Sequence, residues 1–175
     1  ALAKGYIAEA GGEVVGEDLG AVPHYVRPHL EKVGIAGFKV CHWEAFHGED
    51  GLEHPIPGKD YLRCSFATYA THDHPPIAAM WEEFRANISS NDEGERVGAL
   101  WNLRILSEFS GLDLPDDHVS YRAYDDEVKT ALLKALVETN SRYAALMITD
   151  IYGMSERFNI PGTLGDKNWR IRMPF

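Results

Sequence analysis

One pattern limits the fold of this chain more than any other: short apolar segments suited to strands alternate with longer segments of helical spacing. Strands are predicted at residues 14–15, 35–43, 65–70 and 146–149. Helices are predicted at residues 1–10, 23–34, 77–84, 95–109 and 125–140, and residues 44–60 are predicted to be a long loop. Because such alternation is typical of parallel strands joined by crossover helices, we expect an α/β fold with a parallel sheet.

Polar side chains follow the predicted strands. Glu17, His72, Asp73 and Asp150 each come just after one of them. In parallel α/β folds, and above all in the (β/α)8 barrel, catalytic residues gather at the carboxyl ends of the strands. These four residues are therefore candidates for chemistry, although four strands are too few to close an eight-stranded barrel.

The charge balance and the cysteine usage exclude several classes of protein. The 175 residues include 17 Lys plus Arg against 27 Asp plus Glu, a formal net charge of −10. This acidity argues against a nucleic acid or an anionic membrane surface as the main partner and favours a neutral substrate. No apolar run approaches the roughly 18 residues of a membrane-spanning helix. With two cysteines, no CxxC spacing and no secretory signal, we expect a reduced, cytoplasmic location.

The first cluster of interest is Gly16-Glu17-Asp18-Leu19-Gly20, which places two carboxylates in a turn flanked by glycines. One of them is suited to act as a general acid whose pKa is raised by burial, while hydrogen bonds keep the other ionised. The alternative is a solvated loop, or Asp18 as the cap of the following helix.

The second cluster is Thr71-His72-Asp73-His74. A buried Asp can stabilise a developing positive charge, and histidines can donate hydrogen bonds to hydroxyls or bind a metal. The alternative is a polar turn before Pro75-Pro76. A metal-dependent hydrolase that uses His72, Asp73, His74 and Glu17 is disfavoured, because adjacent residues of an extended segment point to opposite sides.

The third cluster lies near the end of the sequence. Asn159-Ile160-Pro161-Gly162-Thr163 and Asn168-Trp169-Arg170 indicate an ordered turn. Trp169 and Arg170 are suited to anchor this segment on the core, and Asn159 is the candidate for a sugar contact.

These three motifs, in this order and spacing, resemble the 4-α-glucanotransferases, also called amylomaltases or disproportionating enzymes, over nearly the whole chain. The resemblance implies a (β/α)8 barrel and a retaining reaction on α-1,4-glucans. It implies that Glu17 is the general acid/base, that Asp73 stabilises the oxocarbenium-like transition state, and that His72 and Asn159 contact the sugar. It implies no cofactor and no metal. His74-Pro75-Pro76 departs from the Asn-Asp-Thr that many members have, which puts the sugar contacts of this loop in question.

The resemblance also implies that part of the enzyme lies outside these residues. The nucleophile of the family is an Asp several dozen residues before the position of Glu17, and only sixteen residues precede Glu17 here. We therefore expect residues 1–175 to be the C-terminal part of the barrel, with a helical insertion at about residues 89–140. The expected partners are maltooligosaccharides, α-glucans and the missing N-terminal part of the barrel. The fragment itself is expected to be inactive, with self-association possible through its open edges. A non-catalytic glucan-binding fragment remains an alternative.

Overall fold

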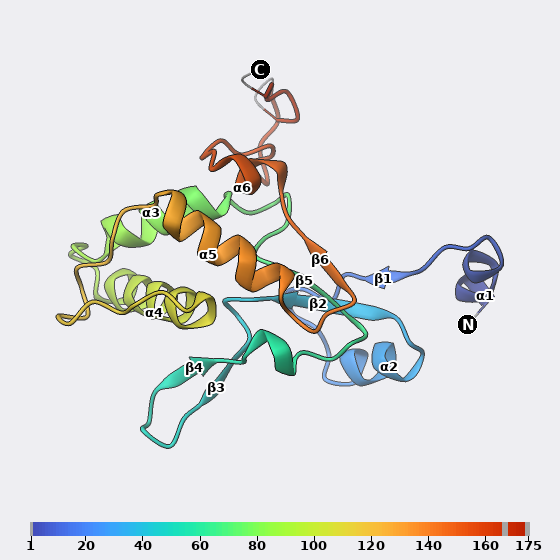
Figure 1. Ribbon diagram of the computed structural model, residues 1–175. Helices are drawn as coiled ribbons and strands as arrows, with labels where there is room; N and C mark the ends of the chain where they lie inside the picture. The colour runs from blue at the N-terminus through green and yellow to red at the C-terminus, as the bar shows by residue number, and fades with distance from the viewer. Residues whose placement is uncertain (1, 166–167, 174–175) are drawn as a thin grey trace.

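A four-stranded parallel sheet lies at the centre of the computed structural model, which describes residues 2–165 and 168–173 (Figure 1). Its strands, in their order across the sheet, are β1 (Val15–Gly16), β2 (Ala36–Val40), β5 (Ser65–Thr68) and β6 (Tyr143–Ala145). Each neighbouring pair is parallel. The predicted α/β fold with a parallel sheet is confirmed.

The two faces of the sheet have different surroundings. On one face, Phe38 of β2 is aligned with Phe66 of β5, and Phe66 with Tyr143 of β6. The ring centroids in this row are 4.6 and 6.2 Å apart, and all three side chains are only partly buried. On the other face, Ala67 is fully buried in the main core. The helices therefore cover one face of the sheet and leave the aromatic row at the other.

The helices carry most of the core. Their bounds are α1 (Leu2–Glu9), α2 (Val26–Lys32), α3 (Ile77–Asn87), α4 (Glu93–Ser110), α5 (Asp126–Val137) and α6 (Ile148–Tyr152). In Figure 1, α3, α4 and α5 lie together beside the sheet, whereas α1 lies apart on the far side of β1. Trp81 of α3, Leu103 of α4 and Leu132 of α5 are almost fully buried. Their common core holds α3, α4 and α5 against the sheet.

Capping residues explain where the long helices begin and end. The side chain of Asp125 accepts hydrogen bonds from the backbone N–H groups of Glu127 and Val128, which starts α5 at the predicted place. Asp92 caps α4 in the same way through Glu95. Gly111 ends α4 with a φ of 71°, a left-handed conformation that costs glycine little.

The prediction of a loop at residues 44–60 is wrong. This stretch holds an antiparallel hairpin of β3 (Ala45–His47) and β4 (Glu53–Pro55), followed by the short 3₁₀ helix η1 (Gly58–Asp60). The turn between the strands includes Gly51, which has a φ of 81°. Glu53 attaches the hairpin to α4, because its carboxylate accepts from the Trp101 indole at 2.8 Å and its carbonyl accepts from Arg104. These contacts across the chain have no local signal in the sequence.

The strand predicted at residues 146–149 is also wrong. The paired strand β6 lies earlier, and Ile148–Tyr152 forms the helix α6. Asp150 therefore lies in a helix instead of at a strand end. Its Oδ1 atom accepts from the backbone N–H of Ile77 at 2.8 Å, so the carboxylate caps the start of α3 from another element. This pairing between distant segments overrides the apolar pattern that indicated a strand.

Within the described residues, no helix combines the length and apolar character needed to cross a membrane.

Candidate functional site

The two carboxylates of the first motif have different environments. Glu17 directly follows β1 and is exposed, whereas Asp18 is buried with 5% of its surface accessible. Asp18 accepts from the backbone N–H of Phe38 at 2.6 Å and from Nε of Arg27 at 3.1 Å. A general acid in this motif was expected to be buried, but the buried carboxylate is Asp18, and Glu17 is exposed. Asp18 does not cap α2, whose N-cap residue is Tyr25, so that alternative is wrong.

A glycine makes room for this buried carboxylate. A Cβ atom at Gly37 would lie 3.1 Å from Oδ2 and 3.2 Å from Oδ1 of Asp18. Contacts this close are rare for real Cβ atoms, so a side chain at position 37 would push the carboxylate aside. Asp18 thus attaches the loop after β1 to β2, and Glu17 stays exposed at the carboxyl end of β1.

A cavity of about 210 Å³ lies at the carboxyl ends of the parallel strands. Its walls are Glu17, Phe38, Phe66, Thr68, Ala70, Thr71, His72, Ala145, Leu146 and Met147. Glu17 and His72, two of the predicted site residues, therefore face the same hollow although 55 positions separate them. Its floor includes part of the aromatic row, a surface suited to an apolar or ring-shaped ligand.

The second motif forms a compact turn next to this cavity. The His74 N–H donates to the Thr71 carbonyl at 3.0 Å, and Oγ1 of Thr71 lies 2.9 Å from Nδ1 of His74. Nε2 of His72 lies 3.4 Å from Oδ1 of Asp73. The two side chains therefore approach each other, which corrects the expectation that they point to opposite sides. The segment is a turn at this point, and alternation holds only for extended chain.

His74 occupies a partly enclosed position between this turn and Trp43. The His74 and Trp43 rings are 5.4 Å apart. Burial lowers the pKa of His74 below its usual value, against the opposing effect of the Asp73 charge. A neutral ring fits the geometry, because its Nδ1 atom accepts from the backbone N–H of Thr71 at 3.3 Å.

The segment after α6 brings the third motif to Asp73. Nδ2 of Asn159 donates to Oδ1 of Asp73 at 2.7 Å, and Nη2 of Arg157 donates to the Asp73 carbonyl at 2.7 Å. The Trp169 ring lies 5.4 Å from the His72 ring. The structure therefore brings His72, Asp73 and Asn159 into one contact network, and Glu17 lines the same cavity as His72.

The side chain of Asn168 organises the turn in which Trp169 lies. Its oxygen accepts from the backbone N–H of Ile160, and its Nδ2 atom donates to the carbonyl and hydroxyl oxygens of Thr163, all at 3.1 Å. This confirms the predicted ordered turn over its described part. Trp169 itself is 63% exposed and contacts His72, so the expected anchoring on the core is wrong for this residue.

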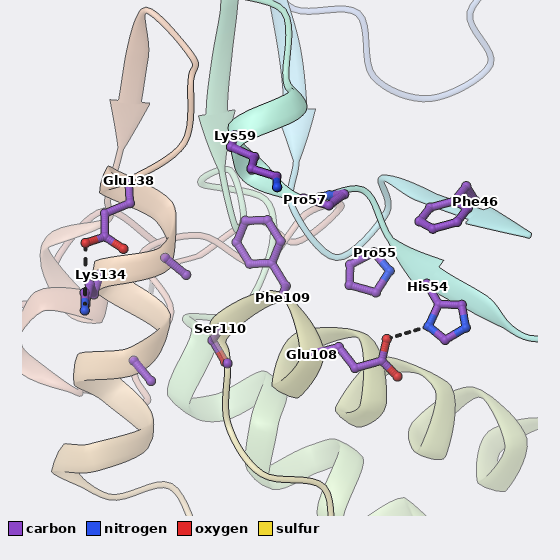
Figure 2. Close-up of a pocket in the computed structure, with 14 residues that line it drawn as sticks. Phe46, His54, Pro55, Pro57, Lys59, Glu108, Phe109, Ser110, Lys134 and Glu138 are labelled. Carbon is purple, nitrogen blue, oxygen red and sulfur yellow. Dashed lines mark hydrogen bonds and ion pairs between the residues drawn. The ribbon is translucent and has the colours of Figure 1, made fainter. Parts of the chain in front are cut away.

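A larger cavity of about 650 Å³ lies elsewhere, between the hairpin, the end of α4 and α5 (Figure 2). Its walls include His54 and Glu108, which contact each other at 2.9 Å, and the ring of Phe109. Pro57, Gly58 and Lys59, which precede β5, also line it. None of the predicted site residues lines this cavity, so this larger hollow and the candidate site are different places.

A protein-family model covers nearly the whole chain. The model of a family described as 4-alpha-glucanotransferase matches residues 3–175. The chain belongs to the 4-alpha-glucanotransferase family. The family predicted from the three sequence motifs is therefore confirmed.

Two curated relatives are considerably longer than this chain. It is 28% identical to a 4-alpha-glucanotransferase of Chlamydia pneumoniae over 169 residues, which cover 91% of this chain and 28% of that protein. It is 28% identical to one from Mycobacterium bovis, with 93% and 23% of the two chains covered. The chain thus spans about a quarter of the length of these curated relatives.

Solved structures show the same relationship. The crystal structure of amylomaltase from Corynebacterium glutamicum matches with a TM-score of 0.68 and 28% identity, covering 92% of this chain and 25% of that one. The amylomaltase from Streptococcus agalactiae in complex with acarbose matches with a TM-score of 0.59, covering 91% and 27%. At 20% identity, the second likeness shows the fold alone.

No metal cluster is formed by this member of the 4-alpha-glucanotransferase family within residues 2–165 and 168–173. No group of three or more His, Cys, Asp or Glu side chains in this part is placed to hold an ion. His72 and Asp73 do meet, but each also has another contact, with Trp169 and Asn159 respectively. The metal-dependent hydrolase alternative receives no support.

Sequence reasoning missed Arg157 and Trp43 at this site, and it gave Trp169 a different role. Arg157 binds the Asp73 carbonyl, Trp169 packs beside His72, and Trp43 packs beside His74. Arg157 lies two positions before the singled-out Asn159, which is the one local signal for it. Nothing in the sequence around Trp43 indicates that its ring reaches a turn 28 positions later, because the register of β2 and β5 decides that contact.

Proposed function

We propose that this chain supplies the acid/base half of the catalytic site of a 4-α-glucanotransferase, which moves α-1,4-glucan segments between maltooligosaccharides. Membership of the family supports the reaction. The shared cavity of Glu17 and His72, with Asp73 next to His72, supports the location. The observation that carries the proposal is that two motifs far apart in the sequence meet at the carboxyl ends of parallel strands.

In this reaction Glu17 moves the proton. In the first step its protonated carboxyl group gives a proton to the leaving glucosidic oxygen while a second carboxylate attacks the anomeric carbon and forms a glycosyl-enzyme. In the second step the Glu17 carboxylate removes the proton from the 4-hydroxyl of the acceptor sugar, which displaces the enzyme carboxylate. The anomeric configuration is retained because the carbon is displaced twice.

The other site residues act on the charge and position of the sugar. The Asp73 carboxylate opposes the positive charge that develops on the ring in both transition states. His72 donates a hydrogen bond to the sugar beside the cleaved bond, and Asn159 is a further sugar contact. The second carboxylate of the reaction belongs to a part of the enzyme outside these 175 residues.

We also propose that the sheet is part of a (β/α)8 barrel whose other strands belong to the rest of the enzyme. The coverage of about a quarter of the relatives' length supports this, and so does the partly buried aromatic row at one face of the sheet. The chain alone is then expected to be inactive, because it holds no complete pair of catalytic carboxylates. The helical insertion at about residues 89–140 and the cytoplasmic location stay predictions.

Replacement of the acid/base tests the assignment. In the whole protein, Glu17→Gln is expected to lower kcat for maltotriose disproportionation by about 100-fold or more, because glutamine cannot transfer the proton. The activity is measured as glucose release with maltotriose as both donor and acceptor.

Glu13→Gln is the matched control. Glu13 is also exposed and close to β1, but its carboxylate pairs with Arg142 instead of lining the cavity of Glu17. Near-normal turnover by Glu17→Gln would overturn the assignment, and an equal loss in Glu13→Gln would show that the effect is structural.

A further inference from the structure

Asp73 has few local contacts to hold it in place. It lies in the turn between β5 and α3, outside every described helix and strand, and its side chain is 49% exposed. Within the turn its backbone N–H makes one long hydrogen bond, 3.3 Å to Oγ1 of Thr71. A residue that must oppose a developing charge needs a more defined position than this turn provides alone.

Arg157, in the segment after α6, restrains the position of Asp73. Its Nη2 atom donates to the Asp73 carbonyl at 2.7 Å, and its Nε atom donates to the Asn159 carbonyl at 3.2 Å. Asn159 in turn donates from Nδ2 to Oδ1 of Asp73 at 2.7 Å. The guanidinium group therefore connects the backbone of Asp73 to the residue that holds its carboxylate.

This ring of contacts orients the carboxylate. Oδ1 of Asp73 accepts a hydrogen bond from Nδ2 of Asn159 and lies 3.4 Å from Nε2 of His72. Within the described residues, Oδ2 has no hydrogen bond, so it is the oxygen left for a ligand. Movement of Asn159 or of the Asp73 backbone would turn this oxygen away, and Arg157 restrains both.

We propose that Arg157 is a positioning residue that sets the orientation of Asp73 for glycosyl transfer. The proposal rests on the proposed function for its activity readout. The planar guanidinium is required because two carbonyl oxygens are bound in different directions, which a lysine ammonium on a flexible chain does not reproduce.

The first test compares Arg157→Ala and Arg157→Lys in the whole protein. Misplacement of Asp73 is expected to lower kcat for maltotriose disproportionation by about 100-fold in Arg157→Ala while KM changes less than about threefold, because the transition state depends on the carboxylate more than the bound sugar does. Arg157→Lys is expected to lie between this variant and the wild type.

Arg63→Ala is the matched control. The Arg63 guanidinium also binds two carbonyl oxygens, those of Asn140 and Ser141 at 3.3 and 3.2 Å, but it does so before β5 and β6, at the opposite ends of the strands. Arg63→Ala is expected to keep the kcat of the folded enzyme. Equal kcat losses in the two alanine variants, or an unchanged kcat in Arg157→Ala, would overturn the proposal.

A second measurement is independent of activity. Amide hydrogen exchange at residues 71–74 is expected to become about tenfold faster in Arg157→Ala and to stay unchanged in Arg63→Ala, because Arg157 binds this turn and Arg63 binds carbonyl groups elsewhere. Unchanged exchange in Arg157→Ala contradicts the positioning role. If the whole wild-type protein fails to disproportionate maltotriose, the proposed function fails, and the exchange result still decides whether Arg157 holds the turn.

Discussion

Asp150 is a carboxyl group enclosed almost completely by the protein, with 2% of its surface accessible. Its Oδ1 atom accepts from the N–H of Ile77, and the rings of Tyr69 and Tyr124 are close enough to interact with its charge. Burial raises its pKa to about 6 from a usual value of 3.8, although the backbone hydrogen bonds of Ile77 and Met147 oppose the shift. The ionised form is therefore unfavourable in the folded state.

This pKa gives Asp150 a pH-dependent effect on stability. Since the pKa of the folded state lies above that of the unfolded state, the protonated group favours folding at low pH, and this advantage is lost as the pH rises through about 6. At pH 7.5 the ionised group costs about 3 kcal/mol, since one pKa unit corresponds to about 1.4 kcal/mol.

Asp150→Asn is expected to remove this cost. The amide oxygen can still accept from Ile77, so the free energy of unfolding should rise by up to about 3 kcal/mol at pH 7.5 and change little near pH 4. Urea denaturation of the chain at both pH values measures it. Asp116→Asn, at an exposed position, is the control and should change little. A variant less stable than the wild type at pH 7.5 would show that the charge on the first turn of α3 stabilises more than its burial costs.

At the scale of elements, the β3–β4 hairpin depends on a histidine that lies between two carboxylates. Nδ1 of His54 lies 2.9 Å from Oε2 of Glu108 on α4, and Nε2 lies 2.9 Å from Oδ2 of Asp50 in the hairpin turn (Figure 2 shows the contact with Glu108). Both nitrogens can donate only when the ring is protonated. Hydrogen bonds to Glu108 and then to Asp50 raise the pKa of His54 above its usual 6.5.

The attachment of the hairpin should therefore weaken at high pH. A raised folded-state pKa means that the stabilising effect is present below about pH 6.5 and is lost as the pH rises through the higher value. We expect amide exchange in residues 45–54, corrected for its intrinsic pH dependence, to be slower at pH 6 than at pH 9. His54→Gln should abolish this difference.

His29→Gln in α2 is the control for the same measurement and should keep the difference. A hairpin whose corrected exchange is equal at both pH values in the wild type would contradict the expectation. Arg104 would then be the contact that holds the hairpin, because it binds the Glu53 carbonyl and Glu108 without a titrating histidine.

At the scale of the whole molecule, the sheet has an aromatic row that the described residues cover only partly. Phe38, Phe66 and Tyr143 form this row, and among the described strands β1 pairs only with β2 and β6 only with β5. Open strand edges and exposed apolar surface favour association between chains. In the proposed barrel, the missing strands would cover both.

The chain by itself should therefore self-associate. We expect its average mass in sedimentation equilibrium to increase with concentration, and Phe66→Gln to reduce the increase by interrupting the row. Ala144→Gln places the same side chain at an exposed position on the opposite face of the neighbouring strand and should have little effect. A mass equal to one chain at every concentration would contradict this expectation.

Much of the fold could be predicted because its signals are local. Asp125 caps α5 and the apolar spacing of Ile77, Met80 and Trp81 marks α3, so these helices lie where the sequence places them. The hairpin and α6 were missed because contacts of Glu53 and Asp150 with distant segments stabilise them. The candidate site divides in the same way: motif order indicated Glu17, His72, Asp73 and Asn159. Arg157 lies near Asn159 in the sequence, but only the structure shows that it binds Asp73.

The sequence by itself determined the α/β class, the parallel sheet and the family, because capping and periodicity are properties of neighbouring residues and the order of the motifs is written along the chain. Only the tertiary structure decided which of two adjacent carboxylates is buried and that Arg157 and Asn159 converge on Asp73. The physical reason is that burial and hydrogen bonding depend on what packs opposite a side chain. For Asp18 that is β2, and for Asp73 it is a segment more than 80 positions later.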